Sequence, residues 1–473
     1  MSKLPKLSLK IILLLFSCQV YLVHCIIPEQ CGANLTLGIP VCCPVSHDTN
    51  EVCGGPKRGE CIKAWTPKES VPSVFLIDDR IDWPNRYFTY FCQCKDNYFG
   101  VACDECWFGW IGKHCNQRHR KIRRDIRTFS EKDLNIFKSL VLHSQTWPSG
   151  YLLVDESDNW NVDPLRKPKL FHASIQHFLT YLHQYGSRST LYKNVKDCEE
   201  YGILNFNHDG VVFPTWHRYS LLLWERLYAR MAKVLFGLED YAAPYWDWIG
   251  KDHCDICIDK YIGGPGHRDE FGLHLSPYSP FHNLTEFCYE PYKDKLCAGC
   301  QYTDEPPTIT RHFTVTEFPD RRDLEFVLGK KQFFVPGERE SNRCDSFHMA
   351  LEGYCGRPGA DPTYRWFHNK MHVMIDGSMC CAATSTNDPI FLLHHTFMDK
   401  IFECWLRLRK PKVEDYPDKG VRPGHSRYSF TVGIIPLARN IDFFASLEYF
   451  GVTYDNYWFG RFSDDGRPPY YCP

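Results

Sequence analysis

The chain has 473 residues, a formal net charge of −2 and an aromatic content of 15%. This length allows more than one domain and a large buried core. The small net charge gives no indication of a nucleic-acid partner, and the aromatic content is typical of a packed globular protein rather than a disordered one.

Residues 1–25 are predicted to be a signal peptide. Lysines precede the apolar run Ile11–Val23, and cleavage is expected after Cys25. No later segment has about 18 consecutive apolar residues, so the sequence predicts no membrane helix. The protein is therefore expected in the secretory pathway, where sequons at Asn34 and Asn283 are candidate N-glycan sites.

Residues 26–117 are predicted to form a small disulfide-rich domain. The run CQCKDNYFGVACDECWFGWIGKHC, from Cys92 to Cys115, resembles an EGF-like module. An oxidising compartment favours disulfides between such cysteines. A zinc site at Cys103 and Cys106 is the weaker alternative, because secretion oxidises the thiols.

Residues 118–128, RHRKIRRDIRT, are strongly basic. A charge run of this kind is more often a solvated linker than anything else. We therefore predict a basic linker between two domains, with a proprotein-processing site as the alternative.

From residue 129 to residue 460 the pattern becomes helical. Ser130 is predicted to cap the first helix, because Asp133 follows three positions later. Asp388 is predicted to cap the last helix. The predicted core is mainly α and of the four-helix-bundle type, with loop-rich insertions, and is followed by a tail at 461–473 without a membrane helix. The predicted helices lie at 129–145, 174–187, 214–237, around 368–372, and at 388–410.

Histidines lie on or beside these helices, and helix bundles build metal sites from such inward-facing side chains. HNKMH places His368 and His372 four residues apart on one helix face. Sets of three imidazoles suit copper or zinc. The histidines in question are His183, His208, His217, His368, His372, His394 and His395.

Two regions resemble the copper-binding regions of the tyrosinase family. They are FNHDGVVFPTWHRYSLLLWE followed by YWDW, and HNKMH followed by NDPIFLLHHTFMDKIFECWL. The Cys-rich head and the runs DDRIDWP, LEGY and IPLARNIDFF are similar to the vertebrate-type members. The resemblance covers roughly residues 30–460.

This resemblance implies a type-3 copper oxidase with two copper ions. Such an enzyme uses O2 to hydroxylate small monophenols such as tyrosine and to oxidise o-diphenols such as DOPA to o-quinones. It would act in melanin synthesis or phenol crosslinking, either secreted or in a melanosome-like lumen. By the resemblance, one copper is held by His183, His208 and His217, and the other by His368, His372 and His395.

The resemblance also implies residues around the substrate. Glu352 and Asn369 match a pair that positions a water as the base for the incoming phenol, although Glu352 in a surface loop is the alternative. Four further residues are expected to line the substrate cavity or its entrance: Val373, Ser385, Tyr354 and His394.

The main alternative is a zinc-holding tyrosinase-related protein that isomerises dopachrome or has no oxidase role. Such relatives usually have Leu-His where this chain has His394-His395, which favours copper. Cys380 and Cys381 depart from the family pattern. A disulfide between sequence neighbours is strained, so each is predicted to pair elsewhere.

Overall fold

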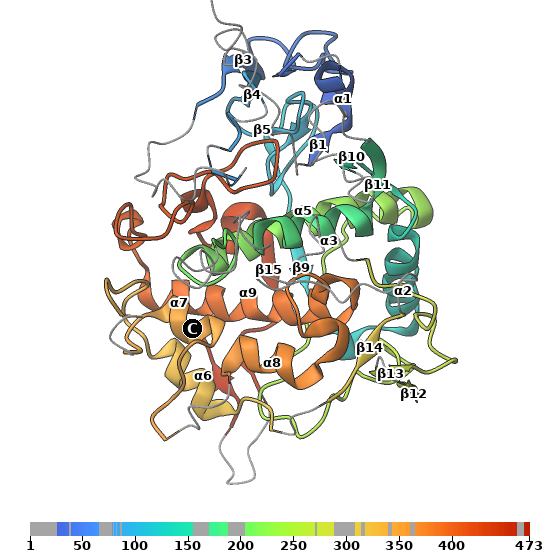
Figure 1. Ribbon diagram of the computed structural model, residues 1–473, viewed down its shortest axis with the longest axis vertical. Coiled ribbons are helices and arrows are strands. Elements are labelled where there is room, and N and C mark those ends of the chain that lie inside the picture. Colours follow the sequence, from blue (N-terminus) through green and yellow to red (C-terminus); the bar gives the residue numbers. More distant parts are fainter. Residues whose placement is uncertain are drawn as a thin grey trace, which may run out of the picture.

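The computed structural model describes residues 26–36, 39–65, 78, 80–81, 83–85, 88–154, 170–187, 204–269, 272–287, 308–313, 317–338, 343–359, 365–460 and 468–473 (Figure 1). The predicted signal peptide lies outside these residues. None of the described helices is long and apolar enough to cross a membrane.

The N-terminal part is built from short strands and disulfides, and it lies at one end of the molecule (Figure 1). All ten of its cysteines are paired: Cys31–Cys42, Cys43–Cys61, Cys53–Cys92, Cys94–Cys103 and Cys106–Cys115. The prediction of disulfides is therefore confirmed here, and the alternative of zinc at Cys103 and Cys106 is wrong.

The elements of this part are small because the bonds, rather than a large core, hold them together. Antiparallel β3 pairs with β4, whose other edge carries parallel β2. The bounds are β1 (Ile27–Pro28), α1 (Glu29–Thr36), β2 (Val41–Cys42), β3 (Gly59–Lys63), β4 (Tyr90–Cys94), β5 (Tyr98–Phe99), β6 (Glu105–Cys106), β7 (Trp110–Ile111), β8 (Gln117–Arg118) and β9 (Lys121–Arg123).

The five helices expected from sequence are present, and two short helices between residues 321 and 352 are additional. The last helix begins after Pro389, so the prediction that Asp388 is its N-cap is wrong. The Ser130 hydroxyl accepts a hydrogen bond from the Asp133 amide, as the capping pattern predicts. Gly237 ends its helix in the left-handed conformation. The bounds are α2 (Glu131–Ser144), α3 (Ile175–Ser187), α5 (Val212–Phe236), α6 (Arg321–Leu328), α7 (Phe347–Glu352), α8 (Phe367–Ile375) and α9 (Ile390–Arg409).

Helices α5 and α9 lie at the centre of the molecule, with α3 and α8 beside them (Figure 1). Most side chains of α3, α5 and α9 are buried, so these helices form the core rather than cover it. The helical core is thus present, while the four-helix bundle stays a prediction, because small sheets and loops make up much of the rest.

These small sheets surround the helical core. Strand β10 pairs with both β1 and β11, β13 lies between β12 and β14, and β15 runs parallel to β9. The bounds are β10 (Pro148–Val154), β11 (Leu170–Ser174), β12 (Pro265–Asp269), β13 (Gly272–Leu275), β14 (Thr310–Arg311), β15 (Val452–Tyr454), β16 (Trp458–Phe459) and β17 (Tyr470–Tyr471).

The basic stretch 118–128 is not a solvated linker, so that prediction is wrong. Arg123 is fully buried, and its guanidinium donates to Glu225, Asp399 and the Tyr454 hydroxyl. A buried guanidinium needs several acceptors to offset the loss of water. Within β9 Lys121 is half-buried, Ile122 is exposed and Arg123 is buried, so only the last side chain of the strand enters the core.

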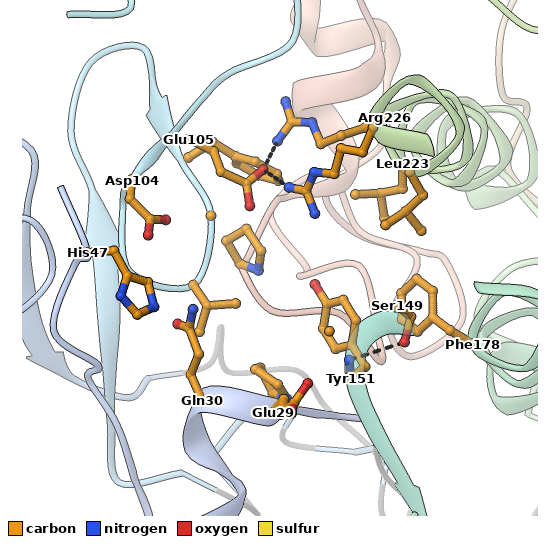
Figure 2. Close-up of a pocket in the computed structure, with 18 residues that line it drawn as sticks. Glu29, Gln30, His47, Asp104, Glu105, Ser149, Tyr151, Phe178, Leu223 and Arg226 are labelled. Carbon is orange, nitrogen blue, oxygen red and sulfur yellow. Dashed lines mark hydrogen bonds and ion pairs between the residues drawn. The ribbon is translucent and has the colours of Figure 1, made fainter. Parts of the chain in front are cut away.

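A cavity of about 410 Å³ lies between the N-terminal part and the helices. Figure 2 shows Glu105 of the N-terminal part next to Arg226 of α5 on one wall of this cavity. The Glu105 carboxylate lies 2.9 Å from Arg226 and 2.7 Å from Arg230. These ion pairs join the disulfide-rich part to the helical core.

One correction concerns cysteines. Cys380 and Cys381 are exposed free thiols, so the prediction that each pairs elsewhere is wrong. The other cysteines of the described residues are already bonded to one another, and a bond between the two neighbours would be strained. The predicted tail at 461–473 is anchored at its end, because Cys472 is bonded to Cys404 of α9.

Candidate metal centre

Three histidines from separate segments meet on one side of the centre. His183 comes from α3 and His217 from the first turns of α5, while His208 lies in the loop before α5. Their ring centroids are 4.8 to 5.6 Å apart, and their ligand nitrogens lie within 4.8 Å of one another.

A second set lies next to the first. His368 and His372 occupy one face of α8, and His395 comes from α9. The three Nε2 atoms are 3.0 to 3.4 Å apart. The His395 ring also stacks on His217 of the first set, with centroids 4.4 Å apart. The two sets are therefore immediate neighbours.

Carbonyl oxygens fix the tautomer of most of these rings. In five of the six histidines, Nδ1 lies 2.7 to 3.0 Å from a backbone carbonyl or a side-chain amide carbonyl. Because a carbonyl only accepts, these rings donate from Nδ1 and carry the lone pair on Nε2. The pairs are His183 with Ala382, His208 with the Asn207 side chain, His217 with Phe213, His368 with the Asn369 side chain, and His372 with Met379.

These lone pairs fit bound cations. Nitrogens bonded to one metal at about 2.0–2.1 Å in a tetrahedral arrangement are about 3.3 Å apart, which matches the second set. The Nε2 atoms of His183 and His217 are buried and have no hydrogen-bond partner among the described residues. Two adjacent three-imidazole sites for copper or zinc are what the donor set supports.

His394 lies beside the second set, yet its tautomer differs. Its ring is fully buried and stacks on His368, with centroids 5.1 Å apart. Nδ1 accepts a hydrogen bond from the Trp248 indole at 3.1 Å. The hydrogen of the neutral ring is then on Nε2, which leaves no lone pair for a metal. This explains physically why His395, and not His394, is the candidate ligand.

Glu352 and Asn369 both contact His368 of the second set. The Glu352 carboxylate accepts hydrogen bonds from the Asp209 and Gly210 amides, next to His208. The Glu352 carbonyl and the Asn369 side chain both accept from His368 Nδ1, at 3.3 and 3.0 Å. The alternative of a surface carboxylate is wrong, because Glu352 is only 1% exposed.

The remaining predicted residues lie in different surroundings. Ser385 is fully buried at the start of the short helix η6 (Ser385–Asn387), and Val373 is 37% exposed on α8 beside His372. Tyr354 is half-buried after α7, with the Arg365 guanidinium 5.6 Å from its ring centroid. Their roles at the substrate cavity stay predictions.

Sequence reasoning did not find the groups that orient the histidines. Ala382, Met379 and Phe213 act through backbone carbonyls, which any residue type provides. Asn207 has a side-chain role, because its amide also donates to the His183 carbonyl at 2.8 Å. The only sequence signal for it is its position directly before His208.

Burial lowers the pKa of all six histidines. The pKa of His183 falls to about 3 and that of His372 to about 4, because desolvation penalises the charged ring. Each ring therefore stays neutral and able to bind a metal well below neutral pH.

We expect the metal-free protein to lose stability as the pH falls from about 6.5 to about 4. In this window the histidines of the unfolded chain bind protons, whereas those of the folded protein stay neutral. Each such histidine therefore lowers the free energy of unfolding by about 1.4 kcal/mol per pH unit. Urea unfolding after chelation, at pH 7, 6 and 5, measures this loss. A His183→Phe variant should show a shallower pH dependence, and equal slopes for both proteins would contradict the expectation.

The fold and the site define a protein with two neighbouring metal sites, each lined by three imidazoles at the centre of a helical core. The sequence profile for the common central domain of tyrosinase matches residues 173–408. The chain is 32% identical to tyrosinase of Bos taurus over 440 residues, with 90% of this chain and 81% of the relative covered.

It is also 30% identical to the 5,6-dihydroxyindole-2-carboxylic acid oxidase of Mus musculus, with 97% and 87% of the two chains covered. A solved polyphenol oxidase of Thermothelomyces thermophila matches with a TM-score of 0.46 at 15% identity, over 71% of this chain and 88% of that one. The chain belongs to the tyrosinase family and is a tyrosinase-type copper oxidoreductase.

Proposed function

We propose that the protein uses O2 and two copper ions to hydroxylate monophenols such as tyrosine and to oxidise o-diphenols such as DOPA to o-quinones. The observation that carries this proposal is the pair of adjacent three-histidine sets, joined by the stacked rings of His217 and His395 at 4.4 Å. In this assignment His183, His208 and His217 hold one ion, and His368, His372 and His395 hold the other.

The bound copper pair supplies the redox chemistry with dioxygen. The protein's contribution is a rigid, dry arrangement of ligands. Carbonyl partners fix the ring tautomers, and burial keeps the rings uncharged. A site preorganised in this way needs little rearrangement when substrate binds.

Deprotonation of the phenol is the step in which the side chains take part directly. A phenol has a pKa of about 10, so its proton needs a nearby acceptor at neutral pH. We assign this role to a water positioned by Glu352 and Asn369. The side-chain contact of Asn369 with His368 supports its part in this role. For Glu352 the support is that its buried carboxylate accepts hydrogen bonds from the Asp209 and Gly210 amides, next to His208.

Val373, Ser385, Tyr354 and His394 are assigned to the walls of the substrate site. Val373 supports this best, since it follows His372 on α8 and is partly exposed. His394 contributes by packing on His368.

The secretory pathway is the proposed location, either outside the cell or in the lumen of a pigment organelle. The disulfides of the N-terminal part support an oxidising compartment. Asn283 is exposed, as a glycan site requires, whereas the Asn34 amide donates to the Val41 carbonyl at 3.0 Å. An EGF-like domain at 26–117 and a copper domain at 129–460 complete the proposal.

The test is metal content followed by substrate assays on protein expressed by secretion. We expect about two copper ions per chain, a number set by the two ligand sets, and o-quinone formation from both tyrosine and DOPA. Oxidation of DOPA alone would restrict the activity to diphenols. Two zinc ions with no oxidation would overturn the proposal and favour the zinc-holding alternative, with dopachrome as the substrate to assay.

A further inference from the structure

A second group of metal-ligating side chains lies on the sheet β12–β13–β14, away from the two histidine sets (Figure 1). His267 and Asp269 are two residues apart on β12 and therefore share a face. His274 lies on β13, where Leu273 pairs with Arg268 and Gly272 with Asp269. The register shifts between Pro265 and Arg268, and within this irregular stretch the rings of His267 and His274 lie side by side.

The three side chains converge at close range. Asp269 Oδ2 lies 2.8 Å from His274 Nε2 and 3.8 Å from His267 Nε2. The two imidazole rings stack with centroids 4.4 Å apart and an interplanar angle of 6°. One ligand atom from each residue lies within 4.8 Å of the other two.

These separations are close to those of a metal site. Ligand atoms bonded to one zinc ion at about 2.0–2.2 Å are about 3.3 Å apart. Asp269 Oδ2 and His274 Nε2 are already within that separation at 2.8 Å, whereas His267 Nε2 lies 3.8 Å from Asp269 Oδ2. Because the His267 ring is nearly parallel to that of His274, it must also rotate to direct Nε2 toward a shared ion. The His267 side chain is 70% exposed, which leaves room for this rotation.

We infer that His267, Asp269 and His274 bind a divalent transition-metal ion, of which zinc is the best fit. Two imidazole nitrogens and one carboxylate oxygen form a three-ligand zinc set, with water completing the coordination. The site is independent of the proposed oxidase function, since it shares no residue with the two histidine sets.

Neighbouring residues support the orientation of the ligands. His274 Nδ1 lies 2.7 Å from the Thr308 hydroxyl, so the Nδ1 hydrogen of a metal-bound ring has an acceptor. Gly272, with a φ of +136°, leaves room for the His312 ring, which a side chain there would meet. The surroundings therefore hold His274 in place, while solvent reaches the group through His267.

A bound ion would strengthen the support of the main site. His312 and Phe313 follow β14, and their amides donate to the Ile375 carbonyl at the end of α8. His312 Nδ1 also lies 3.0 Å from Asp376, which follows α8 directly. Clamping β12 to β13 therefore stiffens the sheet against which the end of the His372 helix rests.

The experiment adds Zn²⁺ to the copper-loaded protein and measures bound zinc by equilibrium dialysis and elemental analysis. We expect one zinc ion per chain beyond the copper, with the copper content unchanged. The variant His267→Ala should weaken this binding at least about tenfold, as loss of a ligand does. This variant is not expected to affect folding, because the side chain it removes is exposed.

The matched control is His253→Ala, which removes an exposed histidine that pairs with Asp252 and lies outside the proposed zinc ligands. It should bind zinc as the parent protein does. Cys380→Ser/Cys381→Ser should also leave zinc binding unchanged, which separates this site from the free thiols. The inference is overturned if no additional zinc binds, if His267→Ala binds it equally well, or if binding is lost with the thiols.

Discussion

Replacing His395 by alanine is expected to remove one of the two bound copper ions and to lower o-quinone formation at least about a thousandfold, because the metal pair supplies the redox step. The His395 ring faces both partners of its own set at 3.4 Å and stacks on His217 of the other. No other described side chain takes over its position. Copper per chain and the initial rate with DOPA measure the two effects.

The adjacent residue provides the control. His394→Phe keeps an aromatic ring on His368 but removes the acceptor of the Trp248 indole. We expect this variant to retain both copper ions, because neither nitrogen of His394 carries a lone pair toward a metal. Loss of copper from His394→Phe, with copper retained in His395→Ala, would reverse the assignment of the ligand.

Replacing Asp399 by alanine is expected to destabilise the folded protein by about 3–5 kcal/mol. Asp399 accepts hydrogen bonds at 2.6 Å from both Arg123 and Arg218, and the side chains of all three are at most 2% exposed. Its loss removes a negative charge from between two buried guanidinium groups. The free energy of unfolding, measured with urea, reports this change.

An exposed ion pair provides the comparison. Lys233 and Glu239 lie 3.0 Å apart with side chains 62% and 67% exposed, so Glu239→Ala should cost less than about 1 kcal/mol. Similar losses for Asp399→Ala and Glu239→Ala would show that the buried network adds little. Asp399→Asn, which preserves the packing, separates the loss of charge from the loss of volume.

The helices and the histidines could be predicted because their signals are local. Ser130 and Gly237 are found at helix ends for reasons that act within one turn. HNKMH places two imidazoles on one face by helical periodicity alone. Family resemblance, rather than spacing, singled out His208, whose loop has no periodic pattern.

The features that were missed depend on contacts between distant segments. Arg123 is one of several basic residues in its stretch of the sequence, and only the fold reveals Glu225, Asp399 and Tyr454 around it. The backbone carbonyls that orient His183, His217 and His372 leave no trace in residue type. Cys380 and Cys381 were expected to pair elsewhere, because the sequence alone does not show how far other cysteines lie from them.

The surroundings of Arg123 also constrain when the core of the protein can finish folding during synthesis. Residues 121–123 pair with residues 452–454, and the arginine contacts side chains at positions 225, 399 and 454. A nascent chain emerges from its N-terminus, so this arginine lacks its last partners until residue 454 has left the ribosome. His395, the last candidate ligand, emerges only about 60 residues earlier. Closure of the core therefore follows the synthesis of both candidate ligand sets.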